Sequence, residues 1–98
     1  MNPEQNGHPP LFPVGQVVAT PGALEAMSEA GQNPLELLKR HQSGNWGVMP
    51  EEDQRENTYS VQYGLRIVSA YVLSTGVKLW LITEADRSVS TFLLPQEY

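Results

Sequence analysis

Residues 66–98, RIVSAYVLSTGVKLWLITEADRSVSTFLLPQEY, decide the fold class of this chain. Residues 66–73, 77–84 and 89–94 are rich in the β-branched and aromatic residues that favour strands. Ser74, Thr75 and Gly76 connect the first two segments, with glycine where a hairpin needs a left-handed backbone. The stretch therefore predicts three consecutive antiparallel strands.

The hairpin turn also sets the register of the first two strands. With Leu73 opposite Val77, Arg66 lies opposite Glu84. Opposite charges directly across a ladder stabilise the pairing by about 0.2–1 kcal/mol, so this pair supports the register independently.

One face of the predicted sheet is expected to be the core. It would carry Val68, Ala70, Val72, Trp80 and Ile82, with Phe92 and Leu94 added from the third strand. Trp80→Ala should then cost about 3–5 kcal/mol, and Arg87→Ala less than about 1 kcal/mol. The other face is also apolar, so the chain's own helices, a second copy or a partner should cover part of it.

Helix signals precede the strands. Thr20 and Asn33 are each followed by proline, as at a helix start, and glycines at 31, 44 and 64 mark the expected helix ends. A third helix, starting near Pro50, is very polar, and its last apolar residues alternate as in a strand.

The predicted fold is α+β. It has a short N-terminal strand at 14–19, two to three helices, and a three-stranded antiparallel meander with the helices packed on one face. Residues 14–98 form one domain, after a proline-rich tail at 1–13 that we expect to be disordered.

Composition limits the function classes. The 98 residues include no cysteine and only two histidines, so a disulfide framework, a thiolate metal site and a structural zinc site are not expected. No apolar run approaches the roughly 18 residues of a membrane helix, and no basic stretch precedes an apolar one, so we expect no signal peptide and a cytoplasmic protein. The net charge of -5 argues against nucleic acid as a partner.

His41 is the first candidate site residue. It lies in Lys39-Arg40-His41-Gln42 at the predicted end of the second helix, where cationic side chains complement the helix dipole. The alternative is a general acid or base, since the unperturbed pKa of histidine near 6.5 suits proton transfer.

Two further segments offer candidates. The polar cluster ITEADRS can be a wide hairpin loop in which Asp86 bonds to the backbone, or it can place Arg87 and Thr91 as donors to a phosphate or carboxylate. Trp46, between glycines in GNWG, can be an exposed interface anchor or can fold back over the core. The chain has no P-loop, GxGxxG, HExxH or GxSxG motif, and we expect no cofactor and no metal.

The segments VVATPGALEAM, RHQSGNWG, LWLITEADRSVST and LLPQEY together resemble a family of small, mostly uncharacterised bacterial proteins. Members are carried on plasmids and other mobile elements, often labelled plasmid-related protein or restriction-system subunit. The resemblance spans Val17 to Tyr98. The family pattern usually has GDWG where this chain has Asn45, and the chain lacks methyltransferase motifs.

Two functions follow from these observations. The first is a non-enzymatic protein that binds another protein or a second copy, with the accessory, regulatory or anti-defence role on a mobile element that the resemblance implies. Its expected contacts are Trp46, Tyr71, Asp86 and Arg87. The alternative is a small metal-independent ribonuclease of the toxin-nuclease type, in which His41, Arg87 and Thr91 transfer a proton and bind the phosphate.

Overall fold

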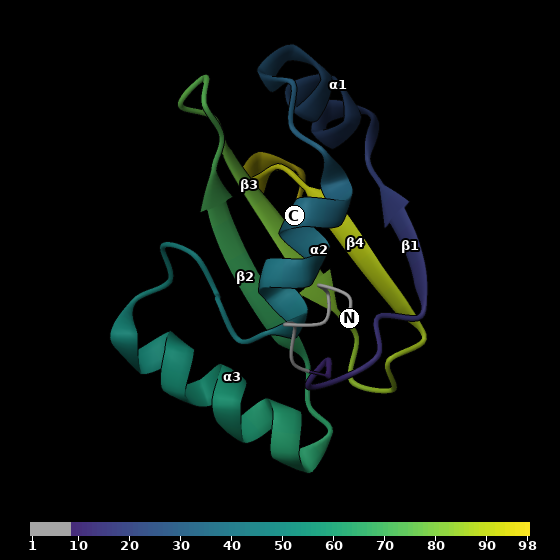
Figure 1. Ribbon diagram of the computed structural model, residues 1–98, viewed down its shortest axis with the longest axis vertical. Helices are drawn as coiled ribbons and strands as arrows, with labels where there is room; N and C mark the ends of the chain where they lie inside the picture. Colours follow the sequence, from purple (N-terminus) through teal and green to yellow (C-terminus); the bar gives the residue numbers. More distant parts are fainter. Residues whose placement is uncertain (1–8) are drawn as a thin grey trace, which may run out of the picture.

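The computed structural model describes residues 9–98. Its elements are β1 (Gln16–Ala19), α1 (Pro21–Ala30), α2 (Pro34–Gln42), α3 (Glu51–Tyr63), β2 (Ile67–Val72), β3 (Lys78–Thr83), β4 (Val89–Leu93) and a 3₁₀ turn, η2 (Pro95–Glu97). The strands form one sheet in the order β1-β4-β3-β2 (Figure 1). Helices α1 and α2 lie over one face, and α3 lies apart from them, beside β2. The fold is α+β, as predicted.

The C-terminal meander has the predicted register. Val68 pairs with Ile82 and Ala70 with Trp80 in the antiparallel β2–β3 ladder, and β4 continues antiparallel to β3. The prediction did not place β1, which pairs with β4 in parallel, from Gln16 opposite Val89 onward. The sheet is therefore mixed rather than a pure antiparallel meander. Three helices between β1 and β2 supply the long crossover that a parallel strand needs.

The core lies on the opposite face of the sheet from the one predicted. Tyr71, Leu79 and Leu81 are at most 1% exposed and pack against the buried side of α1 and α2. Phe92 pairs with Leu81, so it shares this face instead of joining Trp80. Alternation shows which side chains share a face, but both faces here are apolar, and the alternation does not show which one the helices cover.

Local signals set the ends of the helices. The side chains of Thr20 and Asn33 accept hydrogen bonds from backbone N–H groups in the first turns of α1 and α2. Gly31 and Gly64 end α1 and α3 in the left-handed conformation that favours glycine. The polar segment after Pro50 is thus a complete helix, despite its strand-like last residues.

Two sets of hydrogen bonds cover the outer edge of β2, one from the side chain of Asn57 and one from the backbone around Gly47. The side-chain amide of Asn57, on α3, accepts from Val68 N–H and donates to Val68 C=O, at 3.1 and 2.8 Å. Ala70 N–H donates to Trp46 C=O at 3.0 Å, and Val48 N–H donates to Ala70 C=O at 2.7 Å. These contacts pair backbone groups that an edge strand otherwise leaves open to another chain.

The predicted tail falls in two parts. Residues 1–8 lie outside the described residues. Phe12, by contrast, is 5% exposed and packs against Trp46 and Ile67, and Leu11 N–H donates to Gln42 C=O at 2.8 Å. The packed domain therefore includes residues before the predicted boundary at 14.

Candidate functional site

His41 sits in the core, between α2 and the sheet, with no exposed surface. Its Nδ1 lies 2.7 Å from Ser69 Oγ and its Nε2 lies 2.9 Å from Thr83 Oγ1. Thr83 Oγ1 in turn lies 2.6 Å from Ser90 Oγ, which donates to Val14 C=O at 2.8 Å. These groups form one continuous buried chain of hydrogen bonds across three strands.

The carbonyl group of Val14, at the end of this series of hydrogen bonds, fixes the direction of each hydrogen bond in the series. A carbonyl only accepts, so the one hydroxyl hydrogen of Ser90 is used on Val14. Thr83 must then donate to Ser90, which leaves Thr83 Oγ1 to accept from His41 Nε2–H. Nδ1 therefore accepts from the Ser69 hydroxyl. His41 is the neutral Nε2–H tautomer with both nitrogens occupied.

Burial and the nearby charge of Arg87 lower the pKa of His41 to about 3. A second proton on Nδ1 would meet the hydroxyl hydrogen of Ser69, so this hydrogen bond would have to reverse and Ser69 would lose its acceptor. The described structure thus gives His41 a structural role in the core. The sequence prediction that it complements the helix dipole as a cation is wrong, since the ring is neutral and both nitrogens bond to hydroxyls of the sheet.

Arg87 clamps the end of α3 to the β3–β4 loop. Its Nη1 donates to Leu65 C=O at 2.7 Å and to Glu84 C=O at 3.1 Å, and its Nη2 donates to Ser60 C=O at 2.9 Å. The guanidinium also lies over the ring of Phe12, 5.6 Å from its centroid. The donors that could hold a phosphate are therefore largely engaged with carbonyl oxygens.

We expect Arg87→Ala to lower the free energy of unfolding by about 2 kcal/mol, because carbonyls at the end of α3 lose a charged donor. This loss exceeds the value of less than about 1 kcal/mol that the sequence alone predicts for Arg87→Ala. Arg87→Lys should recover only part of the loss, since a lysine ammonium lacks the planar guanidinium group that donates from two nitrogens to separate carbonyl oxygens. Urea unfolding measures both, with Lys78→Ala, an exposed cation, as the control. A loss no larger than that of Lys78→Ala would show that the clamp contributes nothing.

The other expected partner contacts do not form one surface. Trp46 and Tyr71 are 5% and 1% exposed, so Trp46 folds back over the core, the second of its two interpretations. Burial also raises the pKa of Tyr71 to about 12, and its hydroxyl donates to Asn45 C=O. Asp86 is exposed and accepts from the N–H and the hydroxyl of Ser88, as a hairpin loop predicts.

The three residues of the ribonuclease alternative do not converge. His41 and Arg87 both pack on Phe12, but Thr91 pairs with Ile82 and points to the opposite face of the sheet. The predicted Arg66–Glu84 ion pair is also absent from the described residues. Arg66 instead donates to the Tyr98 hydroxyl at 2.7 Å.

The segments that carry the family resemblance contact each other. Thr20 of ATPGAL donates to Glu97 of LLPQEY, which also accepts from Leu94 N–H and so has a lowered pKa. A Cβ on Gly22 would come within 2.4 Å of a Glu97 oxygen. These motif residues hold the C-terminal turn against the start of α1, which gives them a role in the fold.

An open groove on the second face of the sheet is the candidate site. It encloses 510 Å³ between α3, the β2–β3 hairpin and the C-terminal residue. We call it the α3 groove, and its lining is Val48, Met49, Pro50, Asp53, Glu56, Asn57, Ser60, Arg66, Val68, Ala70, Lys78, Trp80, Ile82 and Tyr98. The floor of the groove is apolar, and the α3 wall carries carboxylates. The other wall carries the cations Arg66 and Lys78. It also carries Trp80 and Tyr98, whose ring centroids lie 5.5 Å apart in an edge-to-face arrangement.

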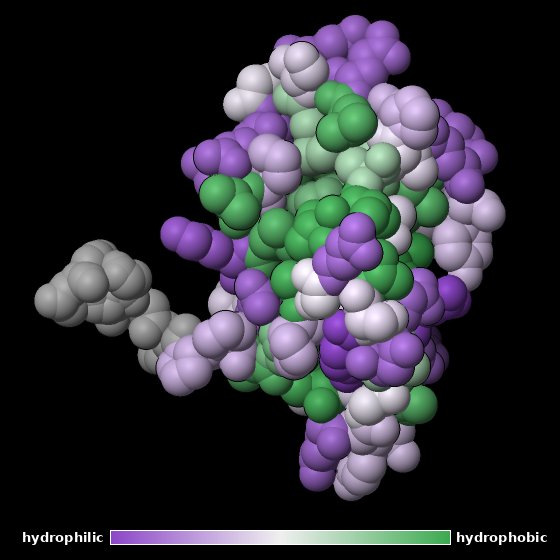
Figure 2. Space-filling model, turned by 90° about the vertical axis from the view of Figure 1, so that its right-hand side faces the viewer, coloured by the Kyte–Doolittle hydropathy of each residue, from purple (hydrophilic) through white to green (hydrophobic). Residues whose placement is uncertain are grey.

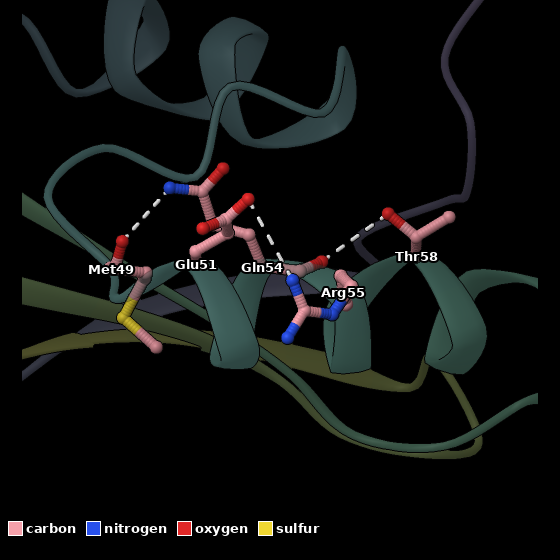
Figure 3. A network of polar contacts seen from close by, with 5 residues as sticks. All are labelled: Met49, Glu51, Gln54, Arg55 and Thr58. Atoms are coloured by element: carbon pink, nitrogen blue, oxygen red, sulfur yellow. Dashed lines mark hydrogen bonds and ion pairs between the residues drawn. The ribbon is translucent and has the colours of Figure 1, made fainter.

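The start of α3 is held in place beside this groove. Gln54 Nε2 donates to Met49 C=O at 2.8 Å, and Arg55 pairs with Glu51 at 3.7 Å (Figure 3). Among residues 9–98 this is the one ion pair, so the carboxylates of Glu52 and Glu56 are not neutralised by a cation of the described chain.

An exposed stripe on α3 extends the groove wall. Glu52, Glu56, Tyr59 and Tyr63 follow one another at spacings of four, three and four, which places them on one side of the helix. The centroids of the two tyrosine rings lie 4.4 Å apart, with the ring planes tilted by 37°, and the residues are 57% and 58% exposed. Exposed tyrosines beside carboxylates can bind a cation through both ring faces and charge.

Sequence analysis missed this site, although one signal for it was present. The second apolar face was recognised, but the groove depends on where α3 and Tyr98 lie, which no local pattern gives.

No helix in residues 9–98 has the length and apolar character needed to cross a membrane. The same residues hold no cluster of three or more metal-ligating side chains. Comparisons with protein-family models, curated proteins and solved structures found no match to this chain.

Proposed function

We propose that the protein is a non-enzymatic interaction protein of a bacterial mobile element that binds a basic segment of another protein in the α3 groove. Its role would be accessory, regulatory or anti-defence, as the resemblance to plasmid-borne proteins implies. The observation that carries the proposal is the groove itself, which combines an apolar floor with unneutralised carboxylates along one wall.

The size and lining of the groove suit a segment of a protein partner. Its volume of 510 Å³ falls within the range of about 300–1,000 Å³ typical of ligand sites. Val68 and Trp80 are only half-buried, so apolar side chains of a partner can gain contact area on the floor. Aromatic residues such as Trp80 and Tyr98 supply large contact areas at low cost in conformational entropy.

Charge selects the kind of partner. Asp53 and Glu56 line the groove and Glu52 continues the stripe, in a chain whose net charge is -5. An acidic segment would be repelled from the α3 wall, whereas lysine or arginine side chains would be attracted to the carboxylates and the exposed tyrosine pair. On the opposite wall, Arg66 is engaged with Tyr98, which leaves Lys78 to meet an acidic group of the partner.

The ribonuclease alternative has less support. It needs His41 to exchange a proton with RNA, and this side chain is buried with both nitrogens engaged. No observation on the described residues favours it over the interaction function.

A charge reversal tests the proposal. The double variant Glu52→Lys, Glu56→Lys should weaken capture of the partner by at least about tenfold, since like charges then face its basic side chains. Glu25→Lys with Glu29→Lys is the matched control, because it reverses two exposed glutamates at the same spacing on α1. The measurement is a tagged pull-down from bacterial lysate, with and without nuclease, followed by titration of the captured protein.

Three results would count against the proposal. Equal loss in both double variants would show a general effect of net charge. Unchanged capture in the α3 variant would place the contact elsewhere. Disappearance of the captured protein after nuclease treatment would point to a nucleic-acid bridge.

A further inference from the structure

The two edges of the sheet are treated differently by the chain. Asn57 and the segment around Gly47 cover the β2 edge through direct hydrogen bonds to Val68 and Ala70. Within residues 9–98 no strand pairs with the outer side of β1, which is the last strand in the order β1-β4-β3-β2. Figure 1 shows β1 as the edge strand on the right, at the opposite end of the sheet from β2.

The free edge of β1 presents unpaired backbone groups. Gln16 N–H donates to Ser88 C=O at 2.9 Å, and Thr20 N–H donates to Phe92 C=O at 3.0 Å. Because backbone direction alternates along a strand, the N–H and C=O groups of Val17 and Ala19 point away from β4. These groups are available to another strand.

The side chains of β1 lack the features that usually block edge pairing. The strand reads Gln-Val-Val-Ala, with no charge and no proline. Val17 and Val18 are 41% and 38% exposed. Figure 2, which looks onto this side of the molecule, shows hydrophobic side chains gathered in the middle of the face with hydrophilic ones around them. Such a rimmed apolar patch is typical of an interface.

We infer that β1 pairs with β1 of a second copy of this chain, in an antiparallel dimer with one continuous sheet. With Val18 on the two-fold axis, Val17 of one copy exchanges hydrogen bonds with Ala19 of the other in both directions. Position 18 faces itself across the two-fold axis in this arrangement, so a charge there would meet a like charge. The uncharged sequence of β1 meets that requirement.

The dimer leaves the α3 groove open. The groove lies beside β2 and β3, and β1 is the strand farthest from β2 in the sheet. A two-fold axis at β1 therefore places one groove at each end of the joined sheet, where two ligand segments can bind at once. This inference rests on the β1 edge and stands whether or not the groove binds a basic partner.

Cysteine cross-linking tests the register, because the natural chain has no cysteine. Val18 faces Val18 of the second copy as a non-hydrogen-bonded pair, with a Cα separation of about 4.5 Å that is within disulfide reach. Val18→Cys should form a disulfide dimer under mild oxidation much faster than Leu35→Cys, a thiol at a 62% exposed position on α2. Equal rates would overturn the proposed register.

Light scattering on a concentration series of the full chain tests the dimer itself. The natural protein should show a dimer mass that dissociates on dilution, and Val18→Lys should raise the dissociation constant by at least about tenfold through like charges on the axis. Leu35→Lys adds the same charge at an exposed apolar position on α2 and should leave the dissociation constant unchanged. A monomer at all concentrations, or equal weakening by both variants, would overturn the inference.

Discussion

Lowering the pH from 7 to 4 should reduce the free energy of unfolding by about 3 kcal/mol through His41 alone. Burial, and secondarily the charge of Arg87, lower the pKa of this side chain in the folded protein to about 3, from 6.5 in the absence of these effects. Between these two values the unfolded chain binds a proton at His41 and the folded chain does not. Stability therefore rises with pH in this window and is lost as the pH falls, by about 1.4 kcal/mol per pH unit.

Urea unfolding at a series of pH values measures this slope, and His41→Gln is the variant that removes it. The variant should be less stable at pH 7, because it cannot bridge Ser69 and Thr83, but its stability should change less between pH 7 and 4. Asp86 and Glu97 have pKa values lowered by hydrogen bonds from Ser88 and Thr20, so they act in the same direction in both proteins. The difference in slope therefore isolates His41.

Nuclear magnetic resonance gives a second reading that does not depend on the stability of a variant. In His8→Gln, His41 is the sole histidine of the chain. Its ring should remain the neutral Nε2–H tautomer from pH 7 down to the onset of acid unfolding. Titration of the folded protein with a pKa near 6.5 would contradict both the buried hydrogen-bond chain and the predicted slope.

The sequence predicts well the parts of the fold that depend on neighbouring residues. The β2–β3 register follows from a short turn and the period of two along a strand, and the paired residues agree. The caps at Thr20 and Asn33 depend on backbone groups within one helical turn. Such interactions are readable because both partners lie close together in the chain.

The parts that depend on distant contacts were not readable. Both faces of the meander are apolar, so only the packing of α1 and α2 decides which is the core. The parallel pairing of β1 with β4 joins segments separated by all three helices. The α3 groove likewise requires the positions of α3 and Tyr98 relative to the sheet.

His41 illustrates the same limit at the level of a single side chain. Its partners Ser69 and Thr83 are 28 and 42 residues away in the chain. A partial signal existed, because Ser69 and Thr83 fall on one face of the predicted hairpin, where apolar side chains alternate with them. Hydroxyls among core positions need hydrogen-bond partners, and a histidine on a neighbouring helix is a suitable one.

Gly47→Ala should lower the free energy of unfolding by about 3 kcal/mol or more, because no side chain fits at this position. A Cβ there would lie 1.9 Å from the carbonyl oxygen of Ala70 and 2.7 Å from the ring of Tyr71. The clash falls on the backbone contact that covers the β2 edge, in which Val48 N–H donates to Ala70 C=O. The substitution must therefore break this contact and displace the buried Trp46 beside it.

Gly64→Ala separates this steric cost from the cost of the backbone conformation. Gly64 has a φ of +70°, close to the +77° of Gly47, but a Cβ at Gly64 would meet nothing within 4 Å. Its replacement should cost only the left-handed conformation, about 1–2 kcal/mol. Urea unfolding of the two variants gives the difference directly. Equal losses would mean that the close approach to Ala70 adds nothing to stability, whereas a larger loss for Gly47→Ala would show that the second glycine of GNWG is required to close the β2 edge.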